Sequence, residues 1–223
     1  MADVTITVRG EHETRIAPEQ GIARITVRDE GPERAPVLER ISVLALPLRD
    51  DLASRLAAGT IVEWSSGRAA VWSDRPWNAE GTRLALVHYA TIDISATFSD
   101  VAALSTWLSD VAERDGVQVG GVEWVLTPAT RAAREQEVAT EAVQVAVARA
   151  TAYARAIGRE TVTPVEIADV GLLGHGDAPG MPASPKMMRA AFGAMDASSG
   201  PAMQFQPEEI TLTAAVEARF TAA

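Results

Sequence analysis

Three histidines are the first residues to test for chemistry, because imidazole can serve as a general base or as a metal ligand. They are His12, His88 and His175. Their separations match no metal-ligand spacing such as HxxxH, which places two rings on one helix face. His88 lies on the apolar register of a strand pattern, so we interpret it as a packed core or interface histidine. The alternative is a hydrolase that uses His88 with a nearby carboxylate.

Other sequence signals of catalysis are weak. The G-x-S-x-G turn of serine hydrolases is absent, and residues 65–67 (SSG) indicate a bend instead. Residues 171–176 (GLLGHG) are glycine-rich, but no helix start follows them, so they fit neither a phosphate-binding loop nor a dinucleotide fingerprint. The carboxylate pairs at 50–51 and 208–209 fit solvated element ends. The chain has no cysteine, which excludes disulfides, thiolate metal sites and a cysteine nucleophile. Because no motif points to an active site either, we expect no cofactor, no bound metal and no enzyme activity.

Methionine is concentrated in one segment. Five of the six methionines lie between residues 171 and 207, in a stretch rich in glycine and proline that we predict to be a long loop. Thioethers are soft ligands for Cu(I), and they also form adaptable contact surfaces. The segment could therefore be a Cu(I) or small-ligand module, a contact with a subunit or partner, or an ordinary loop. Its interface candidates are Met187, Met188, Phe192 and Met195.

Tryptophan gives a second group of interface candidates. Trp72 and Trp77 flank a Ser-Asp-Arg-Pro stretch that predicts an exposed turn. Tryptophan in such a position can anchor a protein interface. Ordinary core packing accounts equally well for Trp124 and Trp64.

The composition limits the classes of partner. A chain of 223 residues with 47% hydrophobic and 22% charged residues is typical of globular proteins. Its formal net charge of −10 disfavours nucleic acid and anionic membranes. No signal peptide and no stretch long enough to span a membrane is visible, so we expect a cytoplasmic protein, or an exported one if a signal peptide was removed.

The hydrophobic periodicity predicts the elements that would position these residues. Residues 127–157 predict one long helix, with many alanines that would allow close approach to a sheet. Residues 33–58 also have helical spacing, and Pro47 should kink this helix or start a second one. The strand patterns include 84–98, which we expect to be central, and 162–170, where Pro164 argues for an edge or a bulge.

Two further strand patterns lie near the N-terminus. Residues 4–8 alternate up to Gly10, and residues 23–27 alternate until 29–32 (DEGP) break the pattern. The order β-β-α-β-β-α-β-α-β-β predicts an α+β fold, with antiparallel sheet packed by two to three helices including one long helix. We expect one domain over 1–223, with the 171–207 loop within it.

This layout resembles the SIMPL-domain family of bacterial proteins. Residues 6–14 (ITVRGEHET) resemble its opening strand, and 88–91 (HYAT) resemble the Gly-Tyr-x-Ala start of its long strand. Residues 120–126 (GGVEWVL) are similar to its Val-x-Gly-Ile-x-Phe-x-Leu strand. Residues 147–158 (VARATAYARAIG) resemble the end of its long helix. The order and spacing of these segments cover nearly the whole chain.

The resemblance implies a non-catalytic protein that can assemble into large homo-oligomers, with links to envelope stress or oxidative defence in exported members. It implies no established active site. Two features depart from the family pattern: no export signal is visible, and His88 stands where the family has glycine. We therefore expect a homo-oligomeric assembly or interaction protein, whose partner is itself or another protein.

Overall fold

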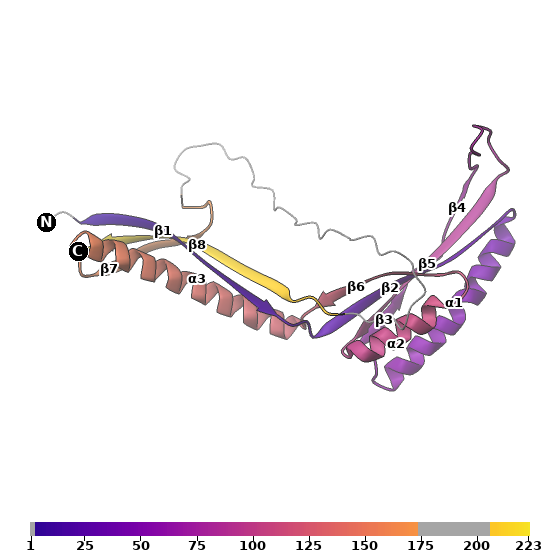
Figure 1. Cartoon of the computed structure of the whole chain (residues 1–223), viewed down its shortest axis with the longest axis horizontal. Coiled ribbons are helices and arrows are strands. Elements are labelled where there is room, and N and C mark those ends of the chain that lie inside the picture. The colour runs from indigo at the N-terminus through magenta and orange to yellow at the C-terminus, as the bar shows by residue number, and fades with distance from the viewer. Residues whose placement is uncertain (1–2, 174–205) are drawn as a thin grey trace. The chain divides into compact units, whose positions relative to one another are not determined.

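The computed structural model describes residues 3–173 and 206–223, and Figure 1 shows its elements. The fold is α+β, with antiparallel sheets and a long helix, as the sequence predicts. The chain divides into two compact units, of which unit 2 contains the continuous stretch Ala17–Thr127 and unit 1 contains chain from both sides of it. Most of the predicted 171–207 loop lies outside the described residues.

Unit 2 is built on a five-stranded sheet. Its strands are β2 (Gln20–Gly31), β3 (Glu63–Ser66), β4 (Ala70–Asp74), β5 (Val87–Phe98) and β6 (Val117–Val125). The order is β3-β5-β2-β6, with β4 also pairing β5, so β5 is central as predicted. It begins at Val87 and not at residue 84, because residues 75–86 form the loop that joins it to β4.

The predicted end of β2 is wrong. The strand continues through the DEGP stretch as far as Gly31, because β5 pairs with it residue by residue, including Glu30 opposite Tyr89. Partner pairing satisfies the backbone groups that a turn would otherwise have to satisfy, and it overrides the weak strand preference of acidic residues. Two more charged side chains are thereby fixed on the sheet.

Two helices cover one face of this sheet, α1 (Arg34–Ala57) and α2 (Val101–Ala112). Because strand side chains alternate between faces, every second residue of β2 and β5 points to the helices and forms the core. The buried core includes Ala23, Ile25, Val27, Ile92, Ile94, Ile41, Leu48, Leu52, Leu104, Trp107 and Leu108. The opposite face carries polar side chains in register, so the sheet has one covered and one open face.

The two helices of unit 2 begin and end for identifiable reasons. Asp100 accepts hydrogen bonds from the backbone N–H groups of Ala102 and Ala103 at 2.8 and 3.3 Å, so it is the N-cap of α2. In α1, Pro47 lies within one continuous helix, so the alternative of a second helix is wrong. The carbonyl that loses its donor belongs to Val43, whose exposed position leaves it accessible to water.

Unit 1 packs α3 (Pro128–Ala156) on a three-stranded sheet. The sheet has the order β1-β8-β7, with β1 (Val4–Ile16), β8 (Ile210–Ala222) and β7 (Val162–Asp169). A row of alanines on α3 is buried against it, namely Ala142, Ala146, Ala150 and Ala154. These small side chains confirm the predicted close approach to a sheet.

Local features of unit 1 follow the sequence except at the end of β1. Gly158 has φ +75°, and the N–H of Arg159 donates to the carbonyl of Ala154, so the glycine ends α3. Pro164 lies in β7, which pairs only with β8 among the described strands and shifts register there, as predicted. However, β1 continues past Gly10 to Ile16.

Candidate functional site

A hairpin of unit 2 carries both tryptophans that we predict to be interface anchors. We call residues 70–91 the aromatic arm, and it consists of β4, the loop 75–86 and the first part of β5. Antiparallel pairing places Trp72 opposite Tyr89 and Ser73 opposite His88. The main contacts of β4 are with β5, so the arm depends on cross-strand pairs for its structure.

The loop of the arm is held by its own polar groups. The side-chain oxygen of Asn78 accepts from the N–H groups of Glu80 and Thr82 at 3.1 and 2.8 Å. Trp77 forms a β-bridge with Arg83, and the Arg83 guanidinium lies 5.0 Å from the centroid of the Trp77 ring. These contacts present the tryptophan in a defined position at the end of the hairpin.

The aromatic arm exposes large apolar side chains to solvent along its length. Trp77 is 61% exposed, Leu84 46%, Trp72 45% and Leu86 40%. The N–H of Leu84 donates to the carbonyl of Pro76 at 2.8 Å, which brings the two sides of the loop together. Scattered exposed leucines are common, but several large side chains in one short hairpin indicate a contact surface.

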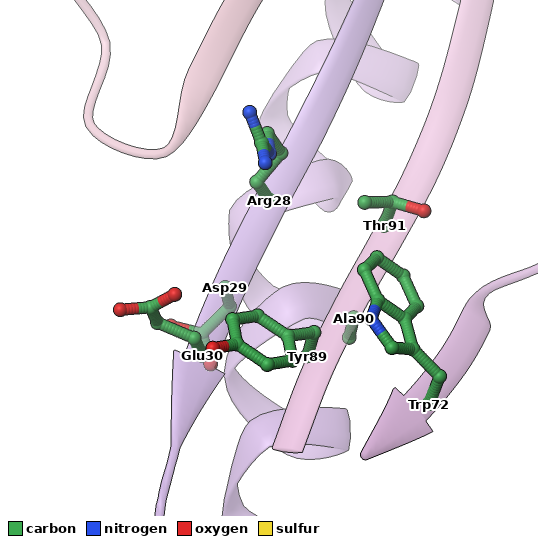
Figure 2. Close-up of a pocket in the computed structure, with 7 residues that line it drawn as sticks. All are labelled: Arg28, Asp29, Glu30, Trp72, Tyr89, Ala90 and Thr91. Atoms are coloured by element: carbon green, nitrogen blue, oxygen red, sulfur yellow. The ribbon is translucent and has the colours of Figure 1, made fainter. Parts of the chain in front are cut away.

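A cleft of about 260 Å³ lies on the open face of the sheet at the base of the arm. Figure 2 shows its lining residues, which come from β2, β4 and β5. Trp72 and Tyr89 form its aromatic part, with ring centroids 5.6 Å apart and ring planes inclined by 16°. Glu30 faces Tyr89 across the strands, so Glu30, Tyr89 and Trp72 form one row over three strands.

The charged groups around the cleft differ in their pairing. Arg28 donates to the side-chain oxygen of Gln118 on β6 at 2.6 Å. Asp29 points to the helix side and forms an ion pair with Arg40 of α1 at 2.9 Å. Within the described residues, the carboxylate of Glu30 makes no hydrogen bond or ion pair. The cleft thus combines two aromatic rings with the unpaired carboxylate of Glu30 and with the guanidinium of Arg28, whose partner Gln118 is neutral.

His88 lies outside this cleft, on the helix-facing register of β5. Its Nδ1 is 2.6 Å from the hydroxyl oxygen of Ser73, and the residue is half-buried. The described residues show no hydrogen bond or ion pair between His88 and a carboxylate. The hydrogen-bond partner of the imidazole is therefore a hydroxyl group, whereas the hydrolase alternative requires a carboxylate at this place.

The remaining candidates fall outside the described part of the chain. They are Met187, Met188, Phe192 and Met195. In residues 3–173 and 206–223, no group of three His, Asp or Glu side chains is placed to hold a metal ion. No helix of that part combines the length and the apolar character needed to cross a bilayer.

Sequence reasoning missed Tyr89 and Glu30. In the sequence, Tyr89 belongs to the HYAT segment that resembles the family's long strand, and Glu30 belongs to the DEGP segment that predicts a strand break. Strand alternation does put Tyr89 on the polar face of β5. Its stacking on Trp72 and its place opposite Glu30 depend on the registers of three strands, which local patterns do not contain.

The described chain is therefore an α+β protein of two compact units with antiparallel sheets. The family model named SIMPL, described as a protein of unknown function (DUF541), matches residues 6–220. This match spans nearly the whole chain and elements of both units, and the chain belongs to the SIMPL family. A search of curated proteins finds no match.

Proposed function

We propose that this protein acts by associating with copies of itself, without catalysis, and that the aromatic arm is the contact surface. The observation that carries the proposal is the exposure of Trp77, Trp72, Leu84 and Leu86 on one hairpin. Complete burial of one large aromatic side chain removes roughly 150–250 Å² from water. Because Trp77 and Trp72 are about half exposed, covering the rest of either one supplies roughly 2–3 kcal/mol at about 25 cal/mol per Å², before the costs of association.

The open backbone edge of β4 also supports a second copy of the chain as the partner. Within the described residues, β4 pairs only with β5, so its other edge has free N–H and C=O groups. An open strand edge beside apolar side chains favours pairing with another strand. In a twofold assembly the same patch of each copy meets the other, and residues 70–91 are similar in number to the 20–30 residues per side of a standard interface.

The solution mass tests the proposal. Light scattering behind size exclusion, at two protein concentrations, should give a discrete multiple of 23.6 kDa that persists on dilution. The double variant Trp77→Ser/Leu84→Ser should lower that mass without unfolding the protein, because both side chains are exposed. A monomeric wild-type protein at both concentrations would refute self-association.

A matched control comes from α1. Val43 is 65% exposed and belongs to α1, which is not part of the arm. Val43→Ser also removes exposed apolar surface and should leave the assembled mass unchanged. If Val43→Ser dissociates the assembly and the arm variant does not, the contact surface lies on α1 and the assignment to the arm is wrong.

A further inference from the structure

We propose that the cleft at the base of the aromatic arm is a binding site for a guanidinium group, supplied by an arginine side chain of a partner polypeptide. The inference shares Trp72 with the proposed contact surface, but it goes beyond self-association because it adds Glu30 of β2 and a ligand chemistry that self-association does not require. It also assigns a ligand chemistry to a site that the sequence did not indicate.

The aromatic part of the cleft favours a flat cation. Trp72 and Tyr89 stack with ring planes inclined by only 16°, and Trp72 remains 45% exposed, so part of its ring surface stays open to a ligand on the open face of the sheet. The face of an aromatic ring is electron-rich and attracts a cation within about 6 Å of its centroid. Guanidinium is planar and weakly hydrated, so it stacks on such a surface better than a compact ammonium does.

The carboxylate of Glu30 offers a partner for a cation. Glu30 lies opposite Tyr89, and its carboxylate has no hydrogen-bond or ion-pair partner within the described residues. Asp29 is neutralised by Arg40, and the positive charge of Arg28 is held toward β6, where Arg28 donates to the neutral side chain of Gln118 at 2.6 Å. A guanidinium that stacks on an aromatic ring of the cleft can donate two parallel hydrogen bonds to the carboxylate of Glu30. The net charge of −10 attracts such a ligand over longer range.

The protein already contains the same type of contact nearby. The guanidinium of Arg83 lies over the ring of Trp77, 5.0 Å from its centroid, at the other end of the arm. Trp77 is thus occupied by an internal arginine, whereas the exposed Trp72 is stacked on Tyr89, which lies between it and Glu30. This arrangement provides an internal control for a binding experiment.

The experiment titrates the full chain with N-acetyl-arginine amide and follows the indole N–H signals by ¹H–¹⁵N NMR. The signals of Trp72 and Trp77 are assigned from the variants Trp72→Leu and Trp77→Leu. The Trp72 signal should shift in a saturable way at millimolar ligand, and the Trp77 signal should not. N-acetyl-citrulline amide, which has nearly the same shape without the charge, should produce no saturable shift.

Two variants locate the site. Trp72→Leu should weaken binding roughly 3- to 30-fold, and Glu30→Gln roughly 2- to 5-fold, as expected for a cation–π contact and an exposed ion pair. Both side chains are exposed, so both variants should fold. An equal response to citrulline, to methyl glucoside or to tetramethylammonium would overturn the assignment, and so would unchanged binding in Glu30→Gln.

The source of the arginine follows from the mass of the Glu30→Gln variant. Nineteen of the twenty basic residues of the chain are arginines, since Lys186 is its only lysine, so a second copy could supply the group. Loss of assembly in Glu30→Gln would identify the occupant as a second copy. Intact assembly together with weakened binding would identify an arginine of a different polypeptide. If the wild-type protein does not self-associate, the proposed function fails, but the NMR titration still tests the guanidinium site by itself.

Discussion

Gly10 of β1 is the position where the packing of unit 1 can be tested most sharply. A β-carbon added there would lie 2.0 Å from the carbonyl oxygen of Ala142 and 2.6 Å from the amide nitrogen of Ala146. Both atoms belong to the backbone of α3, so no side-chain rotation relieves the clash. The helix would have to move by about 1 Å, which would loosen the contacts of its buried alanines with the sheet.

The expected magnitude follows from two opposing effects. Overpacking in a core typically lowers the free energy of unfolding by about 1–3 kcal/mol, and we expect a loss in the upper half of this range because the backbone must shift. Replacing glycine by alanine also lowers the entropy of the unfolded chain, which raises the free energy of unfolding by about 0.4–1 kcal/mol. Gly10→Ala should therefore lower the free energy of unfolding of unit 1 by about 2 kcal/mol. Urea unfolding followed by far-ultraviolet circular dichroism measures this loss.

Two companion variants identify the cause. Gly121→Ala adds the same methyl group on β6 with nothing within 4 Å, so it should change stability by less than about 0.5 kcal/mol. Adding Ala146→Gly to Gly10→Ala should restore little of the lost stability, because the carbonyl of Ala142 still clashes with the added β-carbon. A loss below about 0.5 kcal/mol in Gly10→Ala, or full recovery in the double variant, would refute the packing argument.

Two further predictions concern α1. Leu48 is fully buried whereas Leu46 is 56% exposed, so Leu48→Ala should cost about 2–5 kcal/mol in urea unfolding and Leu46→Ala less than about 0.5. Equal losses would mean that the helix faces the sheet differently. Pro47→Ala should raise the melting temperature, because alanine restores the N–H donor to the carbonyl of Val43 and removes the ring clash, worth about 1–3 kcal/mol. A lower melting temperature would show that the proline ring itself contributes packing.

Much of the fold could be predicted from local patterns, because each pattern has a local cause. The alanine row of α3 has helical spacing and is buried as that spacing requires. Asp100 and Gly158 mark helix ends through their own side chain and backbone conformation. Pro164 weakens strand pairing wherever it stands, so an edge with a register shift could be expected.

The wrong strand ends and the missed site residues have a common cause, which is pairing between strands that are distant in sequence. The extents of β1 and β2 were underestimated because partner strands, and not local preference, determine where pairing ends. The row formed by Glu30, Tyr89 and Trp72 requires three strands in a particular register. Its members are about 17 to 59 positions apart in sequence, and periodicity in a short window contains no information on such pairs.

The interrupted sequence of unit 1 affects the order in which the protein can fold during synthesis. The middle strand of its sheet is β8, which leaves the ribosome after β1, α3, β7 and all the elements of unit 2. Unit 2 has its sheet and both helices within one continuous stretch, so it can fold while later residues are still being translated. Until β8 arrives, β1 and the alanine face of α3 lack the strand that completes their core. Unit 1 is therefore the part of the nascent chain that is exposed to chaperones and proteases for longest.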